Sequence, residues 1–279
     1  IYQSDRYGFN NPDDEWDKKE IEYLLVGDSF THGACVNRPN DISSVLRKLS
    51  NKSVLNLGIA GNGPLIEYAT LREYLNRSVK KVLWVYFEGN DLRNLESEKK
   101  NSFLINYLTD LNFTQNLKLK QKEIDDLAIK IIKKEEKERK KETERNIFEF
   151  NLIKFLKIYE TRLIILPAPP PEPAPALVPG PEFKKILQLA TELTNKNNSK
   201  LYFVYLPQYR LNKKINNNSN YNSVKNIVTK LKIPFIDISK EVFEKEKNSI
   251  QLFPFELRGH YNVKGYKKVA KTIYELTKN

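Results

Sequence analysis

The sequence predicts an α/β protein built as a three-layer α/β/α sandwich, with a central parallel sheet flanked by helices. Short apolar segments alternate along the chain with amphipathic helical stretches, which is the order of an open parallel sheet. The segment 81–87 is apolar throughout, as expected for a strand that helices cover on both faces. A chain of 279 residues is long enough to bury a sizeable core within one domain.

The individual elements follow from apolar runs and from their boundaries. We expect strands near 22–27, 53–57, 81–87, 200–206 and 234–237. We expect helices near 41–50, 64–76, 182–195, 221–231 and 264–276. The fourth strand ends at Pro207, which cannot continue a buried ladder.

A second kind of sequence interrupts this pattern between residues 96 and 181. Residues 104–160 read as helical, and Glu135 with Arg139 forms an i,i+4 pair of the kind that supports a solvated helix. An apolar cluster follows at 148–156, which we interpret as a lid over the site. Residues 167–181 are rich in proline and predict an extended linker that cannot form a core.

The expected domain organisation has one main unit with this insertion. Residues 1–20 form an N-terminal extension, and residues 21–279 form the main domain. The main domain is interrupted by a helical insertion at 96–166 and by the proline-rich linker at 167–181.

The segment Leu24–Phe30 carries the first chemical signal. An apolar strand stops at Gly27-Asp28-Ser29, and open α/β sheets bind ligands at the carboxyl ends of their strands. Ser29 can therefore face a cleft with its hydroxyl and aim its backbone N–H at an anion. The alternative for Ser29 is a helix cap. We expect Asp28 to anchor the turn.

Three more motifs follow the serine in the sequence. The second strand ends in glycines that include Gly61, and a glycine lets the backbone approach a ligand closely. The third strand ends in Gly89-Asn90-Asp91, which places an amide donor at its tip. Near the C-terminus, His260 stands just before an amphipathic helix. The alternatives are turn residues for Gly61 and Asn90 and an ordinary surface or capping histidine for His260.

Together these motifs resemble the SGNH (GDSL-type) hydrolase superfamily. The resemblance implies that Ser29 is the nucleophile and His260 the catalytic base. It also implies that the N–H groups of Ser29 and Gly61 and the amide of Asn90 form the oxyanion hole. The implied fold is the flavodoxin-like SGNH sandwich.

One position departs from the pattern of this superfamily. Its members carry an aspartate three residues before the histidine, where this chain has Leu257. Glu256, one residue earlier, is a candidate for the orienting acid through a shifted backbone. The other readings are a Ser-His dyad whose ring a backbone carbonyl orients, which we favour, and a degenerate site.

The predicted activity is hydrolysis of an O-acyl ester, such as an acetylated carbohydrate. A neutral histidine can take the serine proton, and the oxyanion formed needs donors. The substrate pocket is expected to include His32, Asn62 and Asp91. The alternatives are acyl transfer to a glycan and a non-catalytic binding protein. An α/β-hydrolase elbow is disfavoured, because Ser29 lacks the second glycine of Gly-x-Ser-x-Gly.

Composition limits the partners further. The net charge is +12, but the basic residues are spread along the chain between acidic ones. No nucleic-acid motif appears, so no nucleic-acid partner is expected. The single cysteine, Cys35, is expected to be buried in the first helix. Because the chain has one cysteine and two histidines, we expect no internal disulfide, no metal site and no cofactor. Residues 4–12 resemble the entry segment of envelope-associated members of the superfamily. We therefore also expect association with a membrane or the cell envelope through a segment ahead of Ile1, and a periplasmic or cell-envelope location.

Overall fold

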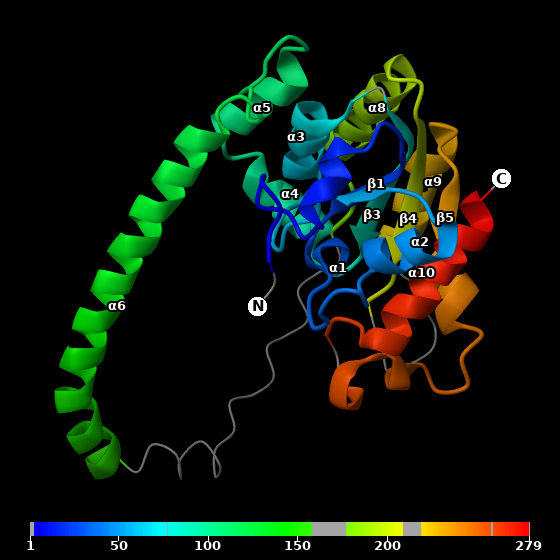
Figure 1. Ribbon diagram of the computed structural model, residues 1–279. Coiled ribbons are helices and arrows are strands. Elements are labelled where there is room, and N and C mark those ends of the chain that lie inside the picture. The colour runs from blue at the N-terminus through cyan, green and yellow to red at the C-terminus, as the bar shows by residue number, and fades with distance from the viewer. Residues whose placement is uncertain (1–2, 77, 158–176, 209–218, 258, 279) are drawn as a thin grey trace. The chain divides into compact units, whose positions relative to one another are not determined.

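The computed structural model describes residues 3–76, 78–157, 177–208, 219–257 and 259–278. The chain forms two compact units, of which the first contains residues 1–115 and 176–279 and the second contains residues 116–175. The first unit holds the sheet and is shown with its helices in Figure 1. None of the helices in the described residues combines the length and the apolarity that crossing a membrane requires.

The sheet has five parallel strands in the order β2-β1-β3-β4-β5. They are β1 (Ile21–Gly27), β2 (Val54–Asn56), β3 (Val79–Phe87), β4 (Lys200–Leu206) and β5 (Phe235–Asp237). This is the flavodoxin-like strand order, in which the direction of winding reverses between β1 and β3. The predicted fold class is therefore confirmed, and all five strands form where the apolar runs placed them.

The helices cover both faces of this sheet. The α-helices are α1 (Ser29–His32), α2 (Ile42–Ser50), α3 (Pro64–Tyr74), α4 (Asp91–Glu98), α5 (Ser102–Thr109), α6 (Gln121–Lys157), α8 (Pro181–Lys196), α9 (Ser219–Lys230) and α10 (Val263–Thr277). Short helical turns are η1 (Asp13–Asp17), η3 (Ser239–Phe243), η4 (Ser249–Leu252) and η5 (Pro254–Glu256). Helix α2 packs against α10, whereas α3 packs against α8. This division is the one that right-handed crossovers between parallel strands produce.

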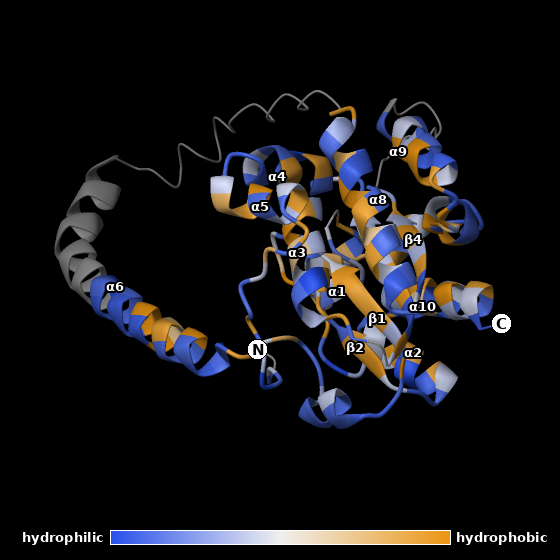
Figure 2. Ribbon diagram, turned by 90° about the horizontal axis from the view of Figure 1, so that it is seen from above, coloured by the Kyte–Doolittle hydropathy of each residue, from blue (hydrophilic) through white to orange (hydrophobic). Residues whose placement is uncertain are grey.

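Side chains alternate between the two faces of the sheet along each strand, so each strand contributes to the core on both faces. Tyr23 and Leu25 of β1 belong to the cluster that includes residues of α2 and α10. On the other face, Tyr86 and Phe203 contact Phe183 of α8. Figure 2 shows that β1 is mostly hydrophobic, and all of its residues except Glu22 are buried. Each fully buried large apolar side chain contributes about 1.5–3 kcal/mol relative to an exposed one.

The region expected to be one long helical insertion is divided. Helix α5 ends at Thr109, and α6 begins only at Gln121. Residues 96–115 lie in the unit of the sheet, because Arg72 of α3 donates to the carbonyl oxygens of Tyr107, Leu111 and Phe113. The second unit therefore starts at residue 116 rather than at 96. Helix α4 was not predicted, since its 8 residues hold few apolar positions.

Two expectations about this region fall largely outside the described residues. The side chains of the apolar cluster at 148–156, interpreted above as a lid, are among them. So are residues 167–176 of the proline-rich linker. The end of that linker is described, and Pro181 is the first residue of α8, with Gly180 as its N-cap. Proline suits this position because it needs no hydrogen-bonded N–H there.

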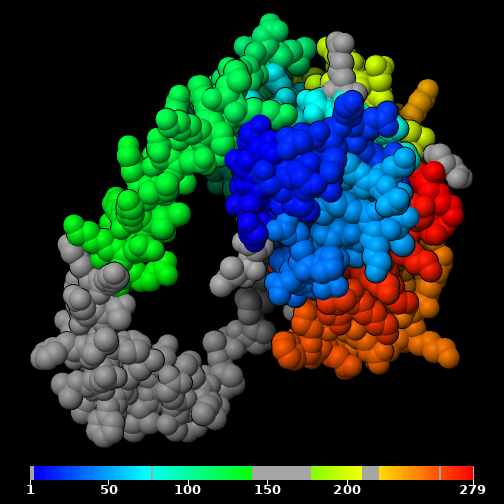
Figure 3. Space-filling model, viewed as in Figure 1, coloured from blue at the N-terminus to red at the C-terminus, as the bar shows by residue number. Residues whose placement is uncertain are grey.

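The N-terminal extension lies along the edge of the sheet. Figure 3 shows the first residues, in dark blue, beside the light-blue surface of residues near 50. Asn11 makes the connection, since its Nδ2 donates to the carbonyl oxygen of Asn56 at 2.9 Å and its Oδ1 accepts from the Asn56 N–H at 2.8 Å. Asn11 therefore occupies backbone groups of the edge strand β2, which would otherwise be open to pairing with another chain.

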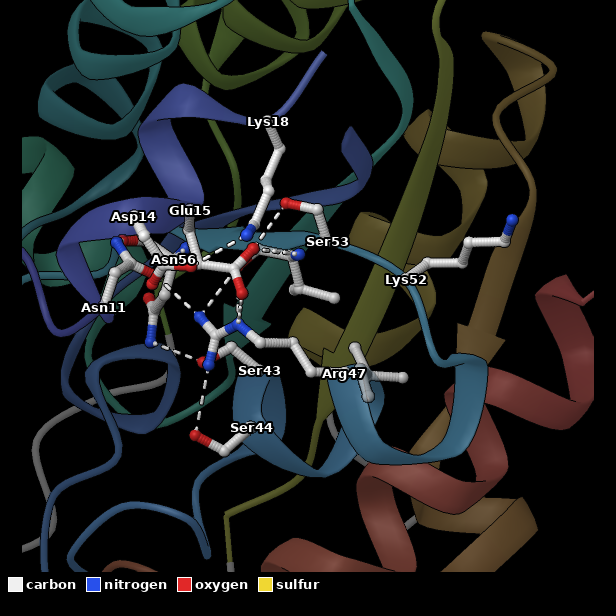
Figure 4. Close-up of polar contacts among 12 residues, drawn as sticks. Asn11, Asp14, Glu15, Lys18, Ser43, Ser44, Arg47, Lys52, Ser53 and Asn56 are labelled. Carbon is white, nitrogen blue, oxygen red and sulfur yellow. Dashed lines mark hydrogen bonds and ion pairs between the residues drawn. The ribbon is translucent and has the colours of Figure 1, made fainter. Parts of the chain in front are cut away.

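Glu15 adds a second attachment, which Figure 4 shows from η1 to α2. Its carboxylate accepts hydrogen bonds from the Ser53 hydroxyl and from the Val54 N–H. It also lies 3.3 Å from Nε of Arg47, and both side chains of this ion pair are nearly buried. Arg47 in turn donates to the carbonyl oxygen of Val54. The extension is thus part of the folded unit.

Candidate active site

A cavity of about 390 Å³ opens where β1 and β3 end. This is the point at which the strand order reverses, where open α/β sheets leave a crevice. The cavity is lined by Ser29, Phe30, Phe87, Gly89, Asn90, Gln208, Gly259 and His260. Residues from both ends of the chain therefore meet at one edge of the sheet.

The turn after β1 presents Ser29 to this cavity. Asp28 is the N-cap of α1, and its Oδ1 accepts from the N–H of Phe30 at 2.9 Å. The capping role considered for Ser29 is thus taken by Asp28. Gly27 allows the tight turn, since a Cβ there would lie 2.6 Å from the carbonyl oxygen of Val85. The serine side chain is left free to point outward from the first turn of the helix.

His260 meets the serine from the other end of the chain. Its Nε2 lies 2.7 Å from the Ser29 Oγ. The loop that carries it is held by Asn262, whose N–H donates to the Leu252 carbonyl oxygen and whose Oδ1 caps α10. The imidazole also packs against Phe30, with ring centroids 4.7 Å apart. The histidine is therefore fixed from both sides.

Asn90, which follows β3 and precedes α4, contacts Asp28. Its Nδ2 donates to the Asp28 Oδ2 at 3.2 Å, which uses one of the two amide hydrogens. The Ser29 Oγ lies 3.3 Å from the same oxygen. Because the hydroxyl has one hydrogen and the distance to His260 is shorter, donation to the imidazole is the stronger interaction.

Burial changes the proton affinity of both ionisable groups in this set. Removal from water lowers the pKa of His260 from its ordinary value of 6.5, and the Asp28 carboxylate opposes that shift. Burial also raises the pKa of Asp28, while the hydrogen bonds from Phe30 and Asn90 oppose that rise. A histidine with a lowered pKa is neutral at pH 7 and can accept a proton at Nε2.

Gly61 does not line this cavity. It is exposed in the loop after β2, with φ of +87°, a conformation that favours glycine. Asn94 of α4 donates to the carbonyl oxygens of Gly61 and Asn62, which holds the loop. Within the described part of the chain, the N–H of Gly61 has no acceptor.

The three residues expected in the substrate pocket are also absent from its lining. Asp91 is fully buried, and its Oδ2 accepts from the N–H of Phe87, so it stabilises the turn after β3. The Nδ1 of His32 lies 3.3 Å from the Gly58 carbonyl oxygen. The carbonyl oxygen of Asn62 accepts from Asn94, as described above. The contacts of Asp91, of His32 and of the Asn62 backbone hold loops around the site.

The structure does not join the candidate acid to the histidine. Glu256 is exposed at the end of η5, and no hydrogen bond or ion pair links it to His260. Leu257, three residues before His260, is 65% exposed. No described carbonyl oxygen is hydrogen-bonded to the ring either.

Cys35 is the neighbour that the sequence did not indicate. We expected it to be buried in the first helix, and this was wrong, because α1 ends at His32 and Gly33 turns the chain away. The thiol is exposed, and its Sγ lies 3.9 Å from Nδ1 of His260.

Other lining residues were missed for a simpler reason. Phe87 ends the apolar strand β3, and Gln208 follows the apolar strand β4 by two residues. Their positions at strand ends could have marked them as lining residues, but their residue types do not suggest chemistry. Gly259 and Gly89 carry no side chain. Within the described ranges, no three His, Cys, Asp or Glu side chains come together as metal ligands would.

Comparison with known proteins finds similarity only among solved structures. No family model and no curated protein sequence matches the chain. A lipolytic protein of the G-D-S-L family from Desulfitobacterium hafniense is 13% identical with a TM-score of 0.47, covering 92% of this chain and 99% of its own. An acetyl xylan esterase is 13% identical with a TM-score of 0.48, covering 92% and 100%. An acetylxylan esterase from Geobacillus stearothermophilus is 14% identical with a TM-score of 0.45, covering 92% and 95%.

Proposed function

We propose that this protein is a serine-dependent ester hydrolase of the SGNH type. The observation that carries the proposal is the distance of 2.7 Å between the Ser29 Oγ and the His260 Nε2 in the cavity that Asn90 also lines. A serine hydroxyl, a neutral imidazole and an amide donor at one site are the groups that acyl transfer requires.

The first half of the reaction uses all of these groups. Ser29 Oγ attacks the ester carbonyl carbon while His260 Nε2 takes the hydroxyl proton. The carbonyl oxygen gains a negative charge, which the N–H of Ser29 and the second amide hydrogen of Asn90 stabilise. Gly61 is the third donor in this proposal: its N–H has no acceptor among the described residues, and its loop would have to bring it to the cavity, which it does not line here. The alcohol then leaves with the proton from His260, and an acyl-serine remains.

The second half repeats the same steps with water. His260 Nε2 removes a proton from a water molecule, whose oxygen attacks the acyl carbon. The tetrahedral intermediate forms at the same donors and collapses to a carboxylic acid, and Ser29 regains its proton. Replacing water by a sugar hydroxyl would give an acyltransferase.

The lining of the cavity supports a small acyl ester on a polar alcohol. The rings of Phe30 and Phe87, with centroids 4.3 Å apart, form an apolar wall beside Ser29 that suits an acyl group. Gln208 provides a polar group for the alcohol. We therefore propose an O-acylated, for example O-acetylated, carbohydrate as the substrate class.

The test is hydrolysis of p-nitrophenyl acetate and butyrate by the wild type and by Ser29→Ala. We expect turnover in the wild type and loss of at least about a thousandfold in the variant, because the nucleophile is gone. A fluorophosphonate should label the wild type once, and peptide mapping should place the label on Ser29. Ser97→Ala, which removes an exposed hydroxyl on α4, is the matched control and should keep full activity.

The outcomes also separate the alternatives named from the sequence. Slow hydrolysis that accelerates on addition of a sugar acceptor would indicate acyl transfer. A third outcome is that the wild type neither hydrolyses esters nor reacts with fluorophosphonate, while Ser29→Ala binds a glycan as tightly as the wild type does. That pair of results would favour a binding protein. Loss of activity in Glu256→Ala would show that this carboxylate reaches the ring during the reaction.

A further inference from the structure

One ring nitrogen of His260 has no role in the reaction proposed above. Nε2 faces Ser29, whereas Nδ1 faces the Sγ of Cys35 at 3.9 Å. No other described residue is hydrogen-bonded to Nδ1. In a serine hydrolase this nitrogen carries the proton that an orienting group accepts, so its partner decides which nitrogen is free to act as a base.

The position of Cys35 is set by both elements of the site. The N–H of Ala34 donates to the Ser29 carbonyl oxygen at 3.0 Å. The carbonyl oxygen of Ala34 accepts from the Tyr266 hydroxyl at 2.9 Å, and Tyr266 is fully buried in α10. Cys35 itself has φ of +69°, a backbone conformation uncommon for residues other than glycine. The backbone next to Cys35 is therefore held by the serine turn and by the helix that follows the histidine.

We propose that Cys35 is the positioning residue of His260, with its sulfur accepting the Nδ1–H hydrogen bond that a carboxylate accepts in related sites. This inference rests on the proposed function, because it concerns the same base. Accepting at Nδ1 fixes the tautomer whose Nε2 lone pair faces Ser29. A thiol sulfur is a weaker acceptor than a carboxylate, so its contribution is smaller than that of an acid.

The imidazole has few other groups around it. Among the described titratable groups, Asp28 acts on the His260 pKa, and it lies beside Ser29, which Nε2 faces. Phe30 packs against the ring without a hydrogen bond. Since Glu256 is exposed and unconnected to the ring, Cys35 is the described side chain that meets Nδ1.

The first experiment measures the tautomer and the pKa of His260 by NMR in the whole protein. The chain has two histidines, so His32→Gln assigns the signals. In the wild type we expect the proton on Nδ1 at neutral pH. Cys35→Ala should lower the His260 pKa, because the imidazolium loses an acceptor, and it should increase the population of the other tautomer. Cys35→Asp should raise the pKa above that of the wild type.

The second experiment is kinetic and uses the same variants. Cys35→Ala should lower kcat by about two- to tenfold with KM unchanged, as expected for one neutral hydrogen bond. Cys35→Asp should restore or exceed the wild-type kcat and move the acid limb of the kcat/KM profile to higher pH. Asn37→Ala, an exposed change in the same loop, is the control and should alter neither quantity.

These measurements separate failure of the inference from failure of the proposed function. An unchanged tautomer, pKa and kcat in Cys35→Ala, with Ser29→Ala inactive, would overturn the role of Cys35 and leave the esterase proposal standing. If the wild type has no esterase activity, the NMR titration still decides whether the thiol holds the ring. Loss of kcat in Cys35→Ala without a change in the pKa or tautomer would also contradict the proposal.

Discussion

The side-chain amide of Asn90 donates a hydrogen bond to the carboxylate of Asp28 across a distance of 3.2 Å. Asp28 directly precedes Ser29 and also holds the N–H of Phe30. One buried carboxylate therefore orients the turn that carries Ser29 and the amide at the tip of the neighbouring strand. Because the second amide hydrogen of Asn90 remains available, the same contact aims a donor at the cavity.

Replacing Asn90 with alanine should lower kcat far more than it changes KM. In the proposed reaction the amide stabilises charge that forms only in the transition state, so its loss should cost about a hundred- to a thousandfold in kcat. Steady-state kinetics with p-nitrophenyl acetate measures both parameters. Asn94→Ala, which removes a nearby amide that binds backbone carbonyl oxygens, is the control and should have a much smaller effect.

Ester hydrolysis should be lost at acid pH with an apparent pKa below 6.5. Burial lowers the His260 pKa from that value, and only the neutral ring can take the serine proton. Activity is therefore present above the His260 pKa and falls as the pH drops through it. The kcat/KM profile of the free enzyme reports this value. Asp28→Asn should move it lower still, because the carboxylate favours the imidazolium.

Glu15→Ala should destabilise the fold by about 2–4 kcal/mol. The change leaves Arg47 without its nearly buried partner and the Val54 N–H without its acceptor. Glu20→Ala is the matched control, since its ion pair with Lys80 is exposed and should contribute less than about 1 kcal/mol. Urea unfolding followed by circular dichroism gives both values. Equal effects of the two changes would show that the Glu15 contacts stabilise the fold no more than an exposed ion pair does.

Glu67→Gln should stabilise the protein more at pH 8 than at pH 5. Burial raises the pKa of Glu67, and the negative charges of Asp91 and Asp28 raise it further. A folded-state pKa above the unfolded value gives stability that is present at low pH and lost as the pH rises through the folded value. Glutamine stays neutral, so the difference in Tm between variant and wild type should grow with pH.

The size of that difference is measurable by calorimetry. Each kcal/mol corresponds to roughly 2–4 °C in Tm for a domain of about 200 residues. Glu96→Gln on the exposed face of α4 provides the comparison and should show little dependence on pH. A constant Tm difference between pH 5 and pH 8 for Glu67→Gln would mean that this carboxyl does not titrate in the range.

Much of the sheet could be predicted because its signal is local. A buried parallel strand needs an unbroken apolar run, and 81–87 and 200–206 form strands at almost those bounds. Helix α4 was missed because two buried leucines, Leu92 and Leu95, are too few to show a period. The boundary of the second unit was missed because Arg72 binds the carbonyl oxygens of residues 107–113 through tertiary contacts that leave no pattern in the sequence.

For the site, the sequence by itself determined which residues stand at strand ends and what chemistry their side chains permit. It placed Ser29 and Asn90 at the tips of strands that are neighbours in the sheet, and parallel strands end at one edge. Only the tertiary structure decided that His260 reaches Ser29 across 231 positions, and that Cys35 rather than Glu256 meets the other ring nitrogen. Those contacts depend on the paths of two loops, which are set by hydrogen bonds such as that from Tyr266 to Ala34. Loop paths carry no repeating pattern, so they follow from packing of the whole unit.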